Sequence, residues 1–153
     1  MIKCTFENGS KASLRHAIID ALVLNSKNQM LLVKRSKEKL LEGGKWALPG
    51  GFVERDETLE ETVTREVREE TGWEVKDLKL LRIIDNPNRP NEDRQNIAFV
   101  YVCRVVRKTG EADQESTEQR WFKLSKLPTK EEFAFDHLQD IEFYLKSKSG
   151  GVA

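Results

Sequence analysis

Short apolar segments separated by polar turns cover most of the chain, and this pattern predicts a sheet-rich fold. The predicted strands are residues 16–24, 29–35, 46–53, 73–85, 96–106 and 118–124. A polar turn at 25–28 joins the first two strands as a hairpin. Segment 96–106 is almost continuously apolar, which favours a central position in the sheet.

Two other segments have the features of helices. In the first, Thr58 and Glu61 have the spacing of a capping box, and Gly72 stands where a glycine commonly ends a helix. Between them an apolar stripe recurs every four residues, formed by Leu59, Val63 and Val67. The second predicted helix is 131–147, and its apolar face consists of Phe135, Leu138, Ile141 and Leu145.

The order of these elements, β-β-β-α-β-β-β-α, predicts an α/β fold with a mixed sheet between helices. A length of 153 residues fits one domain. We therefore expect a single domain over residues 1–148 and a disordered tail at 149–153.

Composition narrows the classes of function. Lysine plus arginine and aspartate plus glutamate each number 26, so there is no global basic field for binding nucleic acid. The two cysteines, Cys4 and Cys103, are far apart and form no zinc motif, which favours a reducing compartment. No segment resembles a signal peptide or a membrane span, so we expect a cytoplasmic protein without a membrane partner.

Three glutamates of the first predicted helix lie near its apolar stripe. At about 100° per residue, with Leu59 at zero, Val63 falls at about 40°. Glu66 then falls at about 340° and Glu70 at about 20°, while Glu69 lies on the flank at about 280°. Two carboxylates are therefore predicted beside the buried face of the helix.

Spacing alone leaves two interpretations of this helix. A solvated helix with ion pairs such as Glu61–Arg65 accounts for the exposed charges. It does not account for Glu66 and Glu70, which repel each other and approach the core. A bound hard cation, Mg²⁺ or Mn²⁺, accounts for carboxylates that are forced together.

A longer pattern favours the cation. The chain contains Gly-x5-Glu-x7-Arg-Glu-U-x-Glu-Glu-x-Gly-U, where U is bulky and apolar, at Gly51, Glu57, Arg65-Glu66-Val67 and Glu69-Glu70-x-Gly72-Trp73. This pattern resembles the Nudix box, from which only Trp73 departs, because an aliphatic residue is usual there. Segments 45–50 (KWALPG) and 121–128 (WFKLSKLP) also resemble Nudix sequences, so the similarity spans most of the domain.

The resemblance implies a fold and an activity. The fold would be an α/β/α sandwich with a mixed sheet. The activity would be hydrolysis of a nucleoside diphosphate linked to another group, with Mg²⁺ or Mn²⁺ as cofactor and a small nucleotide as the bound partner. Many family members dimerise, so a homodimer is an open expectation.

The resemblance also assigns roles to residues. Glu66 and Glu70 would be the main metal ligands, and Glu69 a ligand or base. The Gly50 carbonyl would be a further ligand. Arg65 and Glu57 would support this catalytic group, and Arg65 would pair with the glutamates to hold them in place.

Loop residues complete the candidate site. Family members often take one more carboxylate from a loop after the box, which here is Glu115 or Glu118. Arg35, Arg89 and Arg94 are candidate phosphate ligands, because a guanidinium forms forked hydrogen bonds; the alternative is solvated charge. We expect both histidines, His16 and His137, to be structural.

The substrate is the least determined feature. Residues 46–54 and the loop 89–94 are most similar to ADP-ribose or nucleotide-sugar pyrophosphatases, which release a mononucleotide. Two alternatives stay open. One is a pyrophosphohydrolase of damaged nucleoside triphosphates, and the other is a non-catalytic nucleotide sensor.

Overall fold

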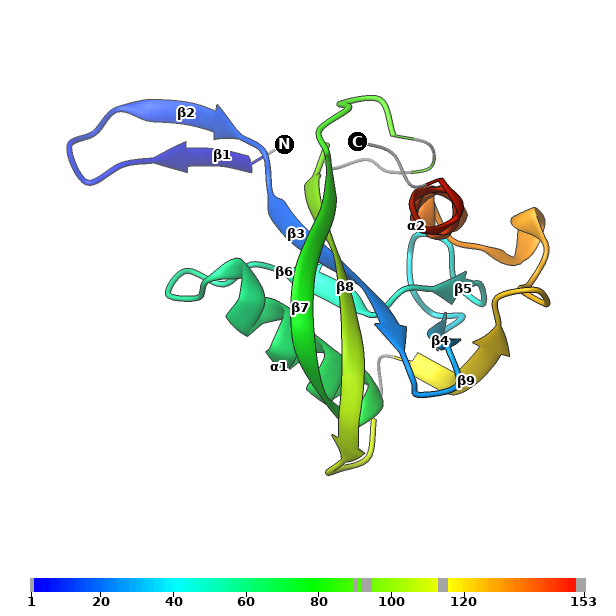
Figure 1. Ribbon diagram of the computed structural model, residues 1–153. Helices are drawn as coiled ribbons and strands as arrows, with labels where there is room; N and C mark the ends of the chain where they lie inside the picture. Colours follow the sequence, from blue (N-terminus) through cyan, green and yellow to red (C-terminus); the bar gives the residue numbers. More distant parts are fainter. Residues whose placement is uncertain (1, 90, 92–94, 113–115, 151–153) are drawn as a thin grey trace.

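A mixed β-sheet forms the centre of the molecule (Figure 1). The computed structural model describes residues 2–89, 91, 95–112 and 116–150, and within them the sheet has seven strands. These are β3 (Ala17–Leu24), β4 (Gln29–Arg35), β5 (Trp46–Ala47), β6 (Gly50–Phe52), β7 (Trp73–Ile84), β8 (Ile97–Lys108) and β9 (Ser116–Lys123). Strands β3 and β8 are parallel, whereas the other pairs are antiparallel.

Helices α1 (Leu59–Thr71) and α2 (His137–Ser149) cover opposite faces of this sheet (Figure 1). Alternate residues of β3 point to opposite faces. On the α1 side, the core contains Ile19, Ala21, Val23, Val63 and Val67. On the α2 side, it contains Leu22, Leu24, Met30, Ile141 and Tyr144. The predicted α/β fold, with a mixed sheet between helices, is confirmed.

Helix α1 begins and ends where the sequence predicts. The N–H of Glu61 donates to Oγ1 of Thr58 at 3.3 Å, and the N–H of Thr58 donates to Oε2 of Glu61 at 2.8 Å, which completes the capping box. Gly72 follows the helix in the left-handed region, with φ of 73°. A Cβ at Gly72 would lie 2.0 Å from the carbonyl oxygen of Gly110, so only glycine fits.

The N-terminal segment contains a hairpin that was not predicted. Strands β1 (Ile2–Thr5) and β2 (Lys11–Leu14) pair with each other in a separate two-stranded sheet, which extends away from the main sheet (Figure 1). Both strands are mostly exposed and only four residues long. Their sequences, IKCT and KASL, alternate apolar and polar residues, but so short an alternation is a weak signal of a strand.

The C-terminal helix begins later than predicted. Residues Lys130–Glu132 form a short 3-10 helix (η1), and α2 begins only at His137. The backbone between them is held by tertiary contacts, since the N–H of Ala134 donates to the carbonyl of Trp46 at 2.8 Å. Phe135 therefore precedes the helix, and the buried residues of α2 are His137, Asp140, Ile141 and Tyr144.

Two further expectations concern the C-terminal tail and membrane-spanning helices. Helix α2 includes Ser149, and residues 151–153 of the expected tail lie outside the described residues. Of the helices that the structure describes, none is long and apolar enough to cross a membrane.

Candidate active site

A cleft of about 640 Å³ brings together three segments that are distant in sequence. One end is formed by β6 and α1, and its lining includes Gly50, Gly51, Arg65, Glu66, Glu69 and Glu70. The other end is formed by the end of β4, the loop after it and the start of α2, and its lining includes Arg35, Leu41, Phe135 and His137. The fold therefore places the predicted metal-binding glutamates in one cleft with Arg35 and His137.

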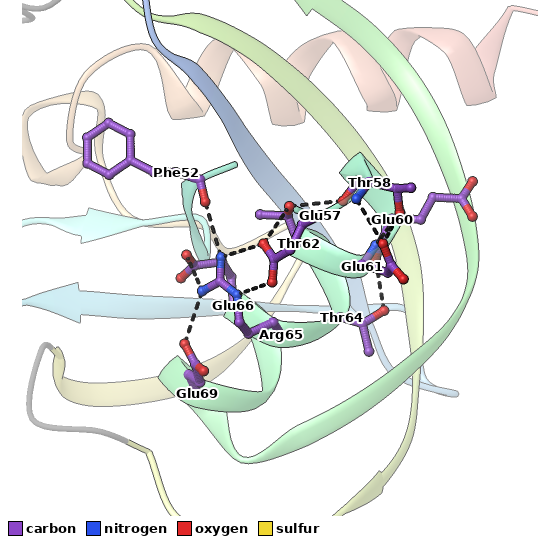
Figure 2. A network of polar contacts seen from close by, with 10 residues as sticks. All are labelled: Phe52, Glu57, Thr58, Glu60, Glu61, Thr62, Thr64, Arg65, Glu66 and Glu69. Carbon is purple, nitrogen blue, oxygen red and sulfur yellow. Dashed lines mark hydrogen bonds and ion pairs between the residues drawn. The ribbon is translucent and has the colours of Figure 1, made fainter. Parts of the chain in front are cut away.

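Arg65 is the centre of a polar network at the first end of the cleft (Figure 2). Its Nε donates to Oε1 of Glu57 at 2.6 Å, and its Nη2 donates to Oε2 of the same carboxylate at 2.9 Å. Its Nη1 donates to Glu66 at 2.8 Å and to Glu69 at 3.1 Å, and Nη2 also reaches the carbonyl of Phe52 at 3.1 Å. One guanidinium thus holds three carboxylates and the end of β6.

The network shifts the acidity of its members. The hydrogen bonds from Arg65 lower the pKa of Glu57 to about 2, so Glu57 is ionised at neutral pH. The same bonds to Glu57, with those to Glu66, raise the pKa of Arg65 above its usual range. Both partners therefore stay charged. The supporting role that the sequence similarity implied for Glu57 and Arg65 at a metal site stays a prediction.

The three glutamates of α1 have the predicted positions. The side chain of Glu66 is 14% exposed and that of Glu69 is 45% exposed. Glu70 is half-buried, and its Oε2 accepts the N–H of Gly50 at 3.1 Å. Glu66 and Glu70 thus lie beside the buried stripe, with Glu69 on the flank.

A glycine, Gly51, lies where β6 passes the helix. A Cβ at Gly51 would lie 2.3 Å from Oε1 of Glu66. The backbone of β6 can therefore approach the carboxylates closely only without a side chain at this position.

The donor set at this end of the cleft fits a hard divalent cation. Carboxylate oxygens of one helix and the backbone of β6 converge there, and oxygen is the preferred ligand of Mg²⁺ and Mn²⁺. Among the residues described, no three His, Cys, Asp or Glu side chains are already arranged around a single metal position. Oxygens of Glu66 and Glu69 instead accept hydrogen bonds from Arg65.

The three candidate phosphate ligands differ in their surroundings. Arg35 lines the cleft, where it donates to the carbonyl of Leu41 at 3.2 and 3.3 Å and lies over the ring of Phe135. Arg89 is buried, and its Nε and Nη2 both donate to Asp136. The fork of Arg89 is therefore bonded within the protein, although Arg89 also lines the cleft, and its predicted role as a phosphate ligand stays a prediction. Arg94 lies outside the described residues.

Of the two candidates for the additional carboxylate, only one lies among the described residues. Glu115 is not among the described residues. Glu118 in β9 accepts a hydrogen bond from Arg120 and does not line the cleft. Ser116 does line it, and its Oγ lies 3.4 Å from the carbonyl oxygen of Glu70.

A buried polar cluster in the wall of the cleft was missed at the level of sequence. It contains Asp20, Arg89, Asp136, His137 and Asp140. Burial raises the pKa values of Asp20 and Asp140 to about 6 and lowers that of His137 to about 4. Burial opposes charge on Asp136 as well, but its hydrogen bonds with Arg89 hold its pKa below the ordinary value. One signal was available, since Asp20 interrupts the apolar strand 16–24.

Comparison with known proteins agrees with this fold. The family model described as the NUDIX domain matches residues 14–141. An ADP-ribose pyrophosphatase of Methanocaldococcus jannaschii is 37% identical over 128 residues, which cover 84% of this chain and 72% of that protein. The chain therefore belongs to the Nudix hydrolase family.

Other relatives and solved structures extend the comparison. The 8-oxo-dGDP phosphatase NUDT18 of Danio rerio is 32% identical over 84% of this chain, although the match covers only 38% of that protein. The NUDIX domain of Shewanella oneidensis NrtR, crystallised with ADP ribose, has a TM-score of 0.67 at 26% identity and covers 90% of both chains. An ADP-ribose pyrophosphatase from Streptococcus suis, at 21% identity, shares the fold with a TM-score of 0.71, over 91% of this chain and 96% of that one.

Proposed function

We propose that this Nudix hydrolase cleaves the pyrophosphate linkage of ADP-ribose or of a nucleotide sugar, with Mg²⁺ or Mn²⁺, and releases a mononucleotide. The observation that carries the proposal is the convergence of Glu66, Glu69 and Glu70 on one end of a cleft of about 640 Å³. This volume is typical of sites for small molecules. The similarity to ADP-ribose pyrophosphatases supports this substrate class.

The roles proposed for the glutamates follow from their positions. When bound, the divalent cation neutralises phosphate oxygens and lowers the pKa of a water molecule. Glu66 and Glu70 would hold the cation, together with the carbonyl of Gly50. Glu69 is the most exposed of the three glutamates, and it acts as a further ligand or accepts the proton of the water.

Other side chains position the carboxylates and the substrate. Arg65 holds Glu66 and Glu69 through Nη1, and Glu57 holds Arg65 in turn. Arg35, which lines the cleft and lies over Phe135, and Arg94 are proposed to bind phosphate. Glu115 is the proposed additional carboxylate, since its neighbour Ser116 lines the cleft beside Glu70.

A substrate panel with matched variants tests this function. ADP-ribose and nucleotide sugars should yield a mononucleotide in the presence of Mg²⁺ or Mn²⁺. Glu70→Gln should lower kcat by more than the roughly 10- to 100-fold that loss of a supporting group costs. Glu60→Gln on the exposed side of α1 should keep wild-type activity. No hydrolysis of any compound by the folded wild-type protein would contradict the proposal.

Hydrolysis of damaged nucleotides is the second candidate function. It is favoured by the similarity to 8-oxo-dGDP phosphatases. Oxidised nucleoside di- and triphosphates therefore belong in the same panel, and the larger kcat/KM decides between the two substrate classes. A non-catalytic sensor would bind ADP-ribose without hydrolysing it.

We also propose that the protein works in the cytoplasm. Both of its cysteines are free, as expected in a reducing compartment. Burial raises the pKa of the Cys103 thiol to about 12, so this cysteine is unreactive.

A further inference from the structure

A histidine at the start of α2 contacts the segment that leads into the metal-binding end of the cleft. The backbone N–H of Leu48 donates to Nδ1 of His137 at 2.9 Å in buried surroundings. Because Nδ1 accepts this bond, the neutral imidazole carries its proton on Nε2. Nε2 lies 3.5 Å from Oδ1 of Asp20, so the second ring nitrogen faces a carboxylate.

The surroundings of His137 keep this arrangement in one protonation state. Its side chain is 6% exposed, and burial lowers its pKa to about 4. At neutral pH the ring is therefore uncharged, and the lone pair of Nδ1 remains available to the N–H of Leu48.

The segment that His137 contacts is held from two sides. On the α2 side, the carbonyl of Trp46 accepts the N–H of Ala134 at 2.8 Å. On the β3 side, the N–H of Ala21 donates to the carbonyl of Pro49 at 2.8 Å. Gly50 then pairs with β3 so closely that a Cβ would lie 2.2 Å from a backbone oxygen. The backbone from Trp46 to Gly50 is thus fixed between α2 and the central strand.

The end of this segment touches the metal-binding face directly. The N–H of Gly50 donates to Oε2 of Glu70 at 3.1 Å. We propose that His137 is a positioning residue for the metal site, because its imidazole fixes Leu48 and thereby sets the Gly50 amide that orients the Glu70 carboxylate. This inference rests on the proposed function, in which Glu70 and the Gly50 carbonyl bind the cation.

The alternative is that His137 only fills the core. A core residue would affect the stability of the protein, whereas a positioning residue also affects cation affinity in protein that remains folded. Two amide variants distinguish the contributions of the two ring nitrogens, Nδ1 and Nε2. In His137→Asn, the side-chain oxygen takes the place of Nδ1 and still accepts from Leu48. In His137→Gln, the longer amide reaches toward Asp20 and leaves Leu48 without its acceptor.

Mn²⁺ binding, measured by electron paramagnetic resonance, is the first readout. His137→Gln should weaken Mn²⁺ affinity by about 10- to 100-fold, the range observed when a group supporting a metal ligand is lost. His137→Asn should stay within about threefold of the wild-type affinity by the same reasoning, and kcat should follow the affinity. Ile141→Ala, a buried change on the same helix, is the control, and it should lower the melting temperature without changing Mn²⁺ affinity.

Hydrogen exchange is the second readout and needs no metal. His137→Gln should speed exchange at the Leu48 and Gly50 amides, while the amides of the α1 centre stay as slow as in the wild type. Unchanged exchange at both positions in folded His137→Gln would overturn the proposal. So would wild-type Mn²⁺ affinity in that variant, or an equal loss of affinity in Ile141→Ala.

The two readouts also separate this proposal from the function on which it rests. If the wild-type protein binds no Mn²⁺, the metal-dependent function fails and the assigned role of His137 in the site is overturned with it. If the wild type binds Mn²⁺ and hydrolyses nucleotides, but the Gln variant does so equally well, only the positioning role is overturned.

Discussion

Individual residues of the site act through close contact. Gly51 allows β6 to pass within contact distance of Glu66, and Arg65 distributes one positive charge over three carboxylates. Without this guanidinium, Glu66 and Glu69 would repel each other on one face of α1. These contacts hold the site together without a bound cation. Gly51 permits the close approach of β6, and Arg65 offsets the negative charge of the carboxylates.

Gly51→Ala tests the close approach. The new Cβ would overlap the Glu66 carboxylate, which lies 2.3 to 2.8 Å from that position. Because the obstacle is the end of a flexible side chain, we expect the carboxylate to move while the fold persists. Mn²⁺ affinity and kcat/KM should fall by roughly 10- to 100-fold, with little change in melting temperature.

Gly110→Ala is the matched control for this change, since a Cβ at Gly110 meets nothing within 4 Å. Calorimetric titration with Mn²⁺ and steady-state kinetics measure the effect. Equal behaviour of the two alanine variants would mean that the approach of β6 to Glu66 does not matter.

Helices α1 and α2 differ in what determines where they begin and end. Helix α1 has local signals at both ends, a capping box at Thr58 and a left-handed glycine at Gly72, and its predicted bounds are correct. Helix α2 has no side-chain cap hydrogen bond from Asp136, whose carboxylate is bonded to Arg89. Its start depends on the contact of residues 133–134 with Trp46, which no local pattern indicates.

Thr58→Ala tests the contribution of the cap to α1. The variant loses the acceptor for the N–H of Glu61, and we expect the free energy of unfolding to fall by about 1 kcal/mol. Urea denaturation followed by circular dichroism measures this change. Thr64→Ala in the middle of the same helix is exposed and removes no cap, so it should have a smaller effect. If both variants lose equal stability, the cap is not what stabilises the helix end.

Asp140 of α2 gives a pH-dependent prediction. Burial raises its pKa from 3.8 to about 6, although Arg82 donates to its Oδ1. As the pH rises, the unfolded chain releases this proton before the folded protein does. The folded state therefore loses stability between roughly pH 4 and pH 6, by on the order of 3 kcal/mol.

Asp140→Asn should remove this loss. The free energy of unfolding of the wild type, relative to the variant, should fall as the pH rises through this window and stay constant above it. Urea denaturation at a series of pH values measures the difference. Asp56→Asn at an exposed position should show no such window. A constant difference between wild type and Asp140→Asn across the series would show that Asp140 titrates normally.

The described residues form a seven-stranded sheet with a core on each face and a two-stranded hairpin outside it. The cleft lies beside the central strand β3, between α1 and the start of α2. There β6 pairs with β3, and the start of α2 contacts residues 46–48. This arrangement lets the core on the α2 side affect a site that is built mainly on α1.

Removal of residues 1–14 tests whether the β1–β2 hairpin is needed for the activity and stability of the rest of the protein. Its principal contacts join its own two strands, and the family match begins at residue 14. We expect the shortened chain to keep its catalytic activity and to change its melting temperature by only a few degrees, about the effect of 1 kcal/mol or less. Loss of activity would show that the hairpin contributes to the site or to an assembly that the site needs.

The sequence by itself determined the features that depend on near neighbours. Helix α1, its caps and the placement of Glu66 and Glu70 beside the stripe follow from spacings of three and four residues, and the mixed sheet follows from the order of apolar segments. Tertiary structure decided the contacts between distant residues. Arg89 is 47 residues from Asp136, and Leu48 is 89 residues from His137. A periodic pattern holds no information about such pairs, because only the packing of α2 against the sheet brings them together.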